Sequence, residues 1–574
     1  MGAFALIRKD ADPTLPDRLT ATLRKRGFAA PRRIDTRDHI LLLANKLITP
    51  TPNFFSDESG DFVAVTGTIF YRESFGLQAL AHLLADAKSE RIDETAFFGS
   101  YAVIVKTGLK LSLFGDGLGT YKIYHTADKA VWSSSFLASL SAVPQPRFDS
   151  QAVYEYVFHG ATFGNGSLIE GLSVLGPENS MRLEPGFLAE PRETAIDIAI
   201  TGEPLRLHTD RSLAVLRSRY RAMANSFGSH IETTLSGGYD SRLSLALLRA
   251  HGATPQLHLQ GSARDPQGRA AKAIASGEGL RPLPERADIA DAPTPESVAA
   301  AVNAQFWAFD GCPSGGVVGT GSDLAAQQTR HESGNLSLDC SGGLLFRNFL
   351  DLPPRAFTIR DLMPIFCGQI TASATSASFS KPQFHKRIEQ KIAAIFPHPW
   401  HELTRVQIEY LYPGFRSRYV YGPDISVANA FGPVVSAFHD LAIARAAIHV
   451  PIRFKNHGIY EAAMIAAVDP RLAAYPSSYG HDFLGRPPLS RQVRDWAAYL
   501  WPLPSRNFMK NIKIIGQSFE INDHFKDDYR KHYLPQGTPV MDHFFVRDAL
   551  RDNVQINRLM TLELLAQHMG VTVP

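Results

Sequence analysis

Hydrophobic and polar positions follow two different patterns in the two parts of this chain. Residues 1 to about 200 contain short apolar runs between Gly- and Asp-rich turns, at 62–65, 69–71, 101–105, 111–114 and 121–124. Such runs are typical of β-strands. Residues 210–230 instead place apolar side chains mostly three or four positions apart, which is typical of a helix. With Gly202-Glu203-Pro204 as a linker, the pattern predicts a sheet-rich part followed by an α/β part.

Length, charge and cysteine content exclude several classes of protein. The chain has 574 residues, room for about two to four domains. Its 59 Lys and Arg nearly balance its 56 Asp and Glu, which argues against a nucleic-acid partner held by a basic surface. Cys312, Cys340 and Cys367 are too few for a disulfide framework and form no CxxC pair for zinc. Without a signal peptide or an apolar run of about 20 residues, we expect a cytoplasmic protein with no membrane partner.

One short segment carries most of the chemistry. A predicted strand at 231–235 and a predicted helix at 242–250 enclose the loop Ser236-Gly237-Gly238-Tyr239-Asp240-Ser241. Glycines let the backbone approach an anion closely. The loop amides, the hydroxyls of the two serines and the positive end of the helix then converge on one concavity. Because Asp240 alone would repel phosphate, its presence indicates a bridging Mg²⁺.

A second strand and helix follow directly. Residues 257–259 predict the strand and residues 269–275 the helix, which closes at Gly277. Two such units in succession are typical of a doubly wound, nucleotide-binding parallel sheet. The alternative is a tight turn that needs its glycines only for geometry, and the complete strand–loop–helix–strand unit argues against it.

These residues carry a resemblance to a known family. The strand–Ser-Gly-Gly-x-Asp-Ser–helix unit resembles the pyrophosphate loop of ATP-pyrophosphatase enzymes, and the chain as a whole is similar to the asparagine-synthetase-like family. Four further segments are similar, in the same order, to the family's NGEIYN, GxFAF, RDxxGxxPLYY and LFxGIxxLPPG motifs, at 66–71, 99–102, 116–124 and 168–177. The resemblance covers most of residues 55–350.

The resemblance implies an α+β domain followed by an α/β domain. Residues 1–200 would form a four-layer αββα, Ntn-type domain, a degenerate form of the class II glutamine-amidotransferase domain. Residues 205–574 would form a doubly wound parallel-sheet ATP-pyrophosphatase domain. The implied cofactors are ATP and Mg²⁺, with Asp240 as metal ligand and catalytic residue. The residues expected to bind the cofactors are Leu235, Ser236, Gly237, Gly238, Asp240, Ser241, Leu259, Ser341 and Gly342.

The first departure from the family concerns glutamine. Family glutaminases begin Met-Cys and use that cysteine as their nucleophile, whereas this chain has Gly2 and no thiol before Cys312. Acyl transfer from glutamine needs a thiolate or an activated hydroxyl. Thr66 and Thr68 also replace the glutamine-contacting Asn and Glu. We therefore expect no glutamine hydrolysis. A lost glutaminase beside a kept ATP loop resembles β-lactam synthetases and lasso-peptide macrolactam synthetases, whose attacking amine belongs to the substrate.

The second departure concerns the acids of the ATP site. The family motif SGEGADE is matched by residues 338–347, which keep a Ser341-Gly342-Gly343 turn but only Asp339 as an acid. The family's catalytic lysine is expected within 453–457, where Lys455 is preferred to His457, with a surface lysine as the alternative. Asp310 takes the place of a family site aspartate before a helix.

The function expected is an ATP-dependent, AMP-forming carbon–nitrogen ligase. A substrate carboxylate would be adenylated with release of pyrophosphate, and a substrate amine would displace AMP. The most specific form is a lasso-peptide-type macrolactam synthetase, with a peptide or small-molecule carboxylate and amine as substrates and a precursor-peptide processing protein as a candidate partner. The alternatives are a ligase that uses free ammonia or a small amine on an amino acid or sugar acid, and a non-catalytic nucleotide-binding paralogue.

Overall fold

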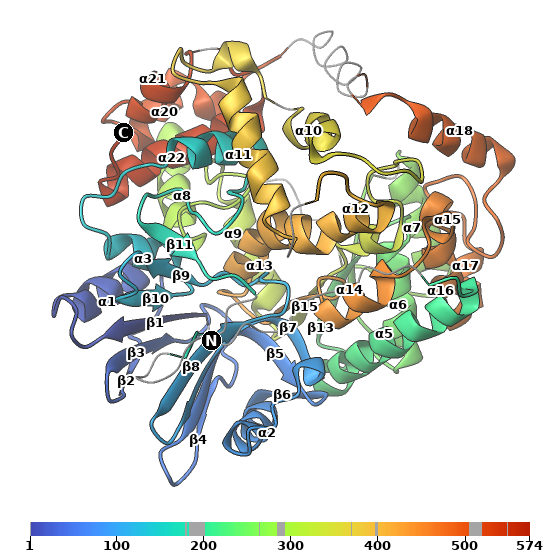
Figure 1. Ribbon diagram of the computed structural model, residues 1–574, viewed down its shortest axis with the longest axis horizontal. Helices are drawn as coiled ribbons and strands as arrows, with labels where there is room; N and C mark the ends of the chain where they lie inside the picture. Colours follow the sequence, from blue (N-terminus) through green and yellow to red (C-terminus); the bar gives the residue numbers. More distant parts are fainter. Residues whose placement is uncertain are drawn as a thin grey trace.

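The structure is a computed structural model, drawn as a ribbon in Figure 1. It describes residues 2–177, 181–182, 201–262, 264–283, 293–368, 370–396, 400–503, 505, 519–547 and 549–574. Strands dominate the blue, N-terminal part of Figure 1, and helices make up most of the rest. None of the helices in these ranges is both long enough and apolar enough to cross a bilayer.

The first of two antiparallel sheets in the N-terminal part has the strand order β11-β9-β10-β1-β3-β2 over the described residues. Its strands are Ala3–Arg8 (β1), Arg32–Asp35 (β2), His39–Ala44 (β3), Tyr124–Thr126 (β9), Val131–Ser133 (β10) and Leu172–Val174 (β11). β1 pairs with β3 along its whole length, from Ala3 opposite Ala44 to Arg8 opposite His39. β1 and β3 are buried at nearly every position because both faces of the sheet are covered.

The second sheet has the order β12-β8-β7-β5-β4, with β6 paired to the end of β5. Its strands are Phe54–Ser56 (β4), Phe62–Tyr71 (β5), Ser74–Phe75 (β6), Phe97–Thr107 (β7), Lys110–Gly115 (β8) and Met181–Arg182 (β12). The long β5–β7 pair runs from Phe62 opposite Lys106 to Tyr71 opposite Phe97. The apolar runs expected as strands at 62–65, 69–71, 101–105 and 111–114 all lie in this sheet.

The two sheets face each other across an apolar layer. Phe4 and Leu41 of the first sheet belong to the same cluster as Ile104 and Leu113 of the second. On its outer face the first sheet packs against α1 (Leu15–Lys25), and the second packs against α2 (Gly76–Lys88). The order is therefore helix, sheet, sheet, helix, the four layers expected for this part of the chain.

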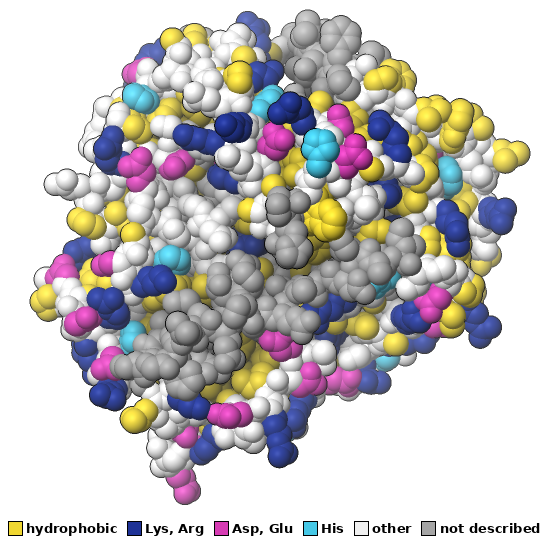
Figure 2. Space-filling view, viewed as in Figure 1, with side chains coloured by type: hydrophobic (Ala, Val, Ile, Leu, Met, Phe, Trp, Pro, Cys, Tyr) yellow, Lys and Arg dark blue, Asp and Glu magenta, His cyan; other side chains and the backbone are white. Residues whose placement is uncertain are grey.

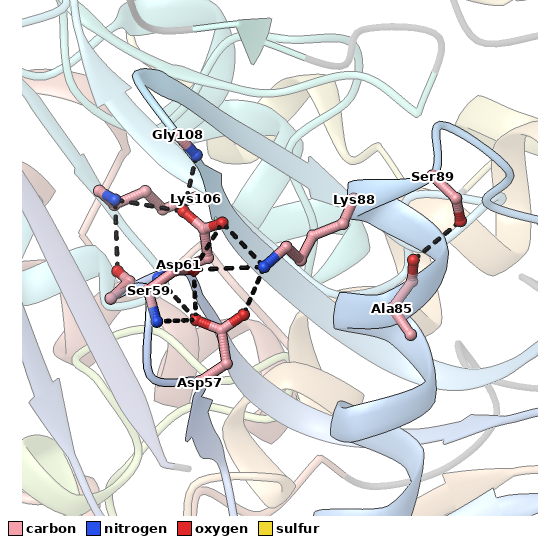
Figure 3. Close-up of polar contacts among 9 residues, drawn as sticks. Asp57, Ser59, Asp61, Ala85, Lys88, Ser89, Lys106 and Gly108 are labelled. Atoms are coloured by element: carbon pink, nitrogen blue, oxygen red, sulfur yellow. Dashed lines mark hydrogen bonds and ion pairs between the residues drawn. The ribbon is translucent and has the colours of Figure 1, made fainter.

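Charged side chains fasten the turn between β4 and β5 to its neighbours (Figure 3). Lys88, the last residue of α2, donates to Asp57 at 2.6 Å and lies 3.4 Å from Asp61. The other oxygen of Asp61 accepts from the backbone N–H of Gly108, in the β7–β8 turn, at 2.6 Å. The contacts with Lys88 and Ser59 lower the pKa of Asp57 to about 2. This cluster joins α2 and two hairpin turns at the end of the second sheet.

The strand expected at 121–124 is wrong for most of its length, because β9 begins only at Tyr124. The Asp116 carboxylate accepts from the backbone N–H of Tyr121 at 2.7 Å, and the Ser426 hydroxyl accepts from that of Lys122 at 2.8 Å. Two backbone donors of the segment thus bind side chains and are lost to strand pairing. The segment is apolar because it is buried as a loop.

A parallel sheet lies in the second part of the chain, with the order β14-β13-β15-β16 over the described residues. Its strands are Ile231–Leu235 (β13), Gln256–Leu259 (β14), Leu336–Asp339 (β15) and Val434–Ser436 (β16). The strands expected at 231–235 and 257–259 are confirmed. Because β14 lies on one side of β13 and β15 on the other, the order reverses at β13, which makes a topological switch point.

Most of the remaining described chain is helical. The N-terminal part adds Phe136–Ser141 (α3) and Ser150–His159 (α4). The second part contains Leu205–Phe227 (α5), Asp240–Ala250 (α6), Pro266–Gly277 (α7), Pro295–Ala308 (α8), Ser322–His331 (α9), Ile359–Cys367 (α10), Lys381–Ala393 (α11), Arg405–Leu411 (α12), Gly422–Ala428 (α13), Leu441–Ile448 (α14), Ile452–Lys455 (α15), Ile459–Val468 (α16), Pro470–Ala474 (α17), Leu489–Leu500 (α18), Asp527–Tyr533 (α20), Pro539–Phe544 (α21) and Asn553–Met569 (α22). The helices expected after the loop and at 269–275 are present as α6 and α7, and both begin before the residue expected.

Helix α18 exposes an apolar face. Leu489, Val493, Trp496 and Leu500 are each more than half exposed, and their spacing of three or four residues places them on one side of the helix. In Figure 2, hydrophobic side chains gather at the upper right, where Figure 1 shows α18.

The two parts of the chain share one hydrophobic core. A single cluster contains Phe70 and Phe98 from the second antiparallel sheet together with Met223 and Leu243 from α5 and α6. Polar contacts also cross between the parts: the buried ammonium group of Lys46 donates to the carbonyl oxygen of Asn429 at 2.6 Å and to that of Gly432 at 2.9 Å. The antiparallel sheets therefore support the parallel sheet directly.

Asp310 connects α8 to the N-terminal part. Its carboxylate accepts from the backbone N–H groups of Phe136 and Leu137, at the start of α3, at 2.7 and 3.1 Å. It also lies 3.2 Å from the Arg26 guanidinium, and both side chains are almost fully buried. Asp310 thereby satisfies helix N–H groups that have no partner within α3.

We expect Asp310→Ala to lower the free energy of unfolding by about 3–5 kcal/mol, because it leaves the buried Arg26 charge without its partner. Asp10→Ala is the matched control: Asp10 is 72% exposed and pairs with Arg8 at the surface, so its loss should cost less than about 1 kcal/mol. Urea-induced unfolding of both variants measures the difference. Equal effects would show that Asp310 does not hold the two parts together.

Candidate functional site

A cavity of about 1020 Å³ lies at the carboxyl ends of β13, β14 and β15. Ser236, Gln260 and Cys340, which follow these three strands, all line it. In open parallel sheets, ligands bind outside the carboxyl ends of the strands at the point where the strand order reverses. The cavity occupies that point.

The loop after β13 is closed by its own serines. The Ser241 hydroxyl accepts from the backbone N–H of Ser236 at 2.9 Å and lies 2.9 Å from the Ser236 hydroxyl. The Ser236 hydroxyl in turn accepts from the backbone N–H of Gly238 at 3.2 Å. These bonds give the loop a defined shape without a ligand.

The start of α6 points its free N–H groups towards the cavity. Tyr239, which precedes the helix, provides no side-chain acceptor for the first turn, and Asp240 and Ser241 of that turn line the cavity. Helix N-terminal amides without internal partners, together with the helix dipole, favour an anion. The geometry is therefore that of an anion site.

Glycine is required in the loop for close packing. A Cβ on Gly237 would lie 2.7 Å from the Cβ of Ala270 in α7 and 3.2 Å from that of Ser478. The carbonyl oxygen of Gly237 accepts from the backbone N–H of Ser478 at 3.0 Å. Gly237 thus sits against α7 and the segment after α17, and Gly238 lines the cavity.

The turn after β15 also approaches the loop through a glycine. Asp339 accepts from the backbone N–H of Ser341 at 2.9 Å and from its hydroxyl at 2.6 Å, which closes the turn. Gly342 has a φ of +111°, a region that favours glycine. A Cβ on Gly343 would lie 2.4 Å from the Asp240 carboxyl carbon, so this turn contacts Asp240 directly.

Arg347 links two carboxylates beside the loop. Its Nη2 donates to Asp240 at 2.5 Å, and its Nε lies 3.0 Å from Glu461, which is fully buried on α16. Burial, and then the neighbouring Asp240 carboxylate, raise the pKa of Glu461 well above its usual value. The two carboxylates raise the pKa of Arg347 against the opposing effect of burial, so the guanidinium stays charged.

Two further cations line the cavity. Lys272 of α7 forms no hydrogen bond or ion pair with any residue in the described part of the chain. Arg330 of α9 lies 3.6 Å from Glu232, which is also 2.8 Å from His258. Lys272 is therefore available to an anionic ligand. On the α7 side the wall is partly apolar, with Leu259, Ala275, Leu280, Pro282 and Leu283.

Most of the cofactor-binding residues expected from the sequence meet at this cavity. Ser236, Gly238, Asp240, Ser241, Leu259 and Ser341 line it. Leu235, Gly237 and Gly342 do not: Leu235 is fully buried in β13, and the two glycines pack against neighbouring chain segments.

The structure does not bring Lys455 to the cavity. Its side chain is fully buried, and its Nζ lies 3.3 Å from Glu409, which also pairs with Arg405 at 2.8 Å. Burial lowers the pKa of Lys455. The alternative of a surface lysine is wrong, and the contacts are those of an internal ion pair. His457 likewise lies outside the cavity lining, 2.9 Å from Asp495.

Sequence reasoning missed Lys272, Arg330 and Arg347. A weak signal existed for Lys272, a cation flanked by alanines in the helix directly after β14. Arg347 ends the stretch that matches the acidic family motif, but nothing local shows that it faces Asp240. Arg330 carries no signal, because its approach depends on how α9 packs.

The positions that matched a glutaminase site serve other roles. A Cβ on Gly2 would lie 2.5 Å from the Phe28 ring, so no nucleophilic side chain fits there without movement. The Thr68 hydroxyl donates to the Asn429 side chain at 2.7 Å and accepts from the backbone N–H of Val434 at 3.0 Å. The expectation that Asp310 belongs to the ATP site is wrong, because it caps α3 and does not line the cavity.

The donors beside the loop do not fit a protein-bound Mg²⁺ at Asp240. Mg²⁺ takes oxygen ligands in near-octahedral geometry, whereas the Asp240 carboxylate is engaged by Arg347 and the Asp339 carboxylate by Ser341. Across the ranges that the structure describes, no group of three or more His, Cys, Asp or Glu side chains is placed to hold a metal ion.

Comparison with known proteins gives only distant likenesses. No family model matches the sequence, and no curated protein matches it. The solved structures that match include glutamine phosphoribosylpyrophosphate amidotransferase from B. subtilis complexed with ADP and GMP, at 14% identity, 49% of this chain, 71% of that chain and a TM-score of 0.22. Another is described as the allosteric regulatory enzyme of purine biosynthesis, at 13% identity, 49% of this chain, 70% of that chain and a TM-score of 0.23. The fold therefore rests on the chain's own strand order and layers.

We expect Gly237→Ala to lower the free energy of unfolding by about 1–3 kcal/mol, because the added methyl group overpacks the contact with α7. Gly485→Ala is the control, since a Cβ there meets no atom within 4 Å. It should change stability by less than about 0.5 kcal/mol. Urea-induced unfolding followed by tryptophan fluorescence compares the two. A Gly237→Ala variant as stable as the control would mean that the loop is not tightly packed.

Proposed function

We propose that this chain is an ATP-dependent ligase that adenylates a substrate carboxylate and joins it to a substrate amine. The observation that carries the proposal is the cavity at the switch point. It combines the free N–H groups at the start of α6, three cationic side chains (Lys272, Arg330 and Arg347) and a partly apolar wall. Phosphates would bind to the N–H groups and the cations, and a purine base would contact the apolar wall. The resemblance of the Ser-Gly-Gly-x-Asp-Ser loop to pyrophosphate loops points to the same ligand.

The proposed reaction uses this chain mainly for electrostatics and positioning. The α6 amides and Lys272 would hold the β- and γ-phosphates and stabilise the leaving pyrophosphate. Attack of the carboxylate on the α-phosphorus forms the acyl-adenylate, and attack of the amine on its carbonyl carbon releases AMP. Exclusion of water from the cavity would protect the adenylate from hydrolysis.

The most specific form of the proposal is a macrolactam synthetase of the lasso-peptide type, which closes a peptide amine onto its own carboxylate. It rests on the resemblance together with the blocked position 2, because a chain that cannot release ammonia from glutamine has to take its amine from another source, which in this form is the substrate peptide itself. A ligase for free ammonia or a small amine on an amino acid or sugar acid is the alternative within the same chemistry.

A second candidate function is a nucleotide-binding protein without turnover. The observation that favours it is the ion pair between Arg347 and Asp240, which occupies the carboxylate expected to bind a metal. Both candidates predict nucleotide binding, and only the ligase predicts reversible pyrophosphate release.

The decisive test is ATP–pyrophosphate exchange with pools of short peptides, amino acids and sugar acids. For a ligase, we expect exchange that depends on one class of carboxylate and falls at least about 100-fold in Asp240→Ala, because Asp240 holds the Arg347 guanidinium in place beside the phosphate site. Exchange without any carboxylate would point to a different reaction. Binding of ATP with no exchange in any pool would favour the non-catalytic candidate.

Lys272 provides a separate test of the phosphate site. We expect Lys272→Met to weaken ATP binding by about 10-fold, since a hydrogen bond to a charged group is lost. Arg269→Met, on the same helix but outside the cavity lining, should change it by less than about 2-fold. Isothermal titration calorimetry measures both. Equal affinities for the two variants would remove Lys272 from the proposed site.

A further inference from the structure

Arg347 stands where the sequence led us to expect a metal ion. Its guanidinium lies 2.5 Å from Asp240, the only carboxylate of the Ser-Gly-Gly-x-Asp-Ser loop, and 3.0 Å from Glu461. Both carboxylate oxygens of Glu461 are buried and accept no hydrogen bond of normal geometry from the described residues. The positive charge beside the Asp240 and Glu461 carboxyl groups is therefore supplied by the chain itself.

The other acid near the loop is also engaged. One oxygen of Asp339 accepts from the backbone N–H of Ser341, and the other accepts from the hydroxyls of Ser341 and Ser436, at 2.6 and 3.0 Å. Three of the about four lone-pair sites of this carboxylate are thus in use, and two of these bonds close the turn that places Gly343 against Asp240. Asp339 is thus a structural acid, although it lines the cavity.

Arg347 is held on several sides. Its Nη1 donates to the Tyr479 hydroxyl at 3.2 Å, and the guanidinium lies 5.5 Å from the centre of the Tyr239 ring. Movement of Arg347 away would leave the two carboxylates facing each other without compensation, which is costly in a buried setting. A guanidinium has five N–H groups. Contacts with Asp240, Glu461 and Tyr479 account for three of them. Because Arg347 lines the cavity, its other N–H groups remain for a ligand there.

We propose that the Arg347 guanidinium is the fixed cation of this site, so that the chain binds the phosphates of a nucleotide without a divalent metal ion coordinated to Asp240. The nucleotide part of the proposal rests on the proposed function. The part that concerns the metal does not, because it depends only on how Arg347, Asp240 and Glu461 are arranged. In this site an arginine takes over the charge neutralisation that the family resemblance assigns to Mg²⁺.

The first experiment measures Mn²⁺, as a probe for Mg²⁺, by electron paramagnetic resonance of the free ion in the absence of nucleotide. We expect Mn²⁺ binding by the unmodified protein to be independent of Asp240, so that Asp240→Asn leaves it unchanged. Arg347→Gln removes the charge and leaves the Asp240 carboxylate, which lines the cavity, without its cationic partner, and it should bind Mn²⁺ at least about 10-fold more tightly than the unmodified protein. Arg347→Lys keeps the charge and should not gain the site.

The double variant Arg347→Gln with Asp240→Asn is the matched control and should lose the gained site. The proposal is overturned if the unmodified protein binds Mn²⁺ as tightly as Arg347→Gln and loses it on Asp240→Asn. It is also overturned if Arg347→Lys gains the same site, because charge would then not be the cause. Near-ultraviolet circular dichroism checks that each variant keeps its tertiary packing.

The second experiment needs no variant. We expect the unmodified protein to bind ATP with an affinity that changes by less than about 3-fold between EDTA and millimolar Mg²⁺. An absolute requirement for Mg²⁺ would overturn the proposal, even if Arg347→Gln fails to fold. If ATP binds under neither condition, the proposed function fails while the Mn²⁺ result on the unmodified protein still decides whether a metal binds at Asp240.

Discussion

One guanidinium compensates two carboxylates that come from distant parts of the chain, and the cavity depends on this contact. Asp240 begins α6, Glu461 lies on α16, and Arg347 follows the turn after β15. Without the arginine, the fully buried Glu461 and the partly exposed Asp240 would lie close together with no cation between them, an unfavourable arrangement. The contact therefore fixes the start of α6 relative to α16, and with it the direction in which the free helix N–H groups face the cavity.

The parallel sheet reaches this geometry with support from the antiparallel sheets. The hydrophobic core runs through both parts of the chain, and buried polar groups cross between them at Lys46, Thr68 and Asp310. Position 2 is closed by Phe28, and Thr68 binds the segment that leads into β16. The residues that match a glutaminase site are thus used for packing against the second part. This use explains how the four-layer fold can be kept without the nucleophile.

The sequence predicted the elements whose signals are local. Strand β13, the glycine loop and helix α6 follow from an apolar run, a pair of glycines and helical periodicity within about twenty residues. The four layers followed from a family resemblance spread over many weak matches. The strand at 121–124 was wrong because the side chains of Asp116 and Ser426 bind two of its backbone N–H groups. The pattern of apolar residues does not report such bonds. Lys455 was chosen only because it lies in the window, 453–457, where the family's catalytic lysine is expected, while packing buried it beside Glu409.

By itself, the sequence determined that a glycine loop joins a buried strand to a helix, because turn chemistry and helical periodicity act over a few residues. It also determined that position 2 carries no nucleophile. Only the tertiary structure decided which charges meet there. Asp240 and Arg347 are 107 residues apart, and Lys272 and Arg330 reach the cavity from α7 and α9. Contacts between residues so far apart in the sequence depend on how whole helices pack. The free-energy cost of burying a charge depends on the groups that surround it in the folded protein, which local sequence does not specify.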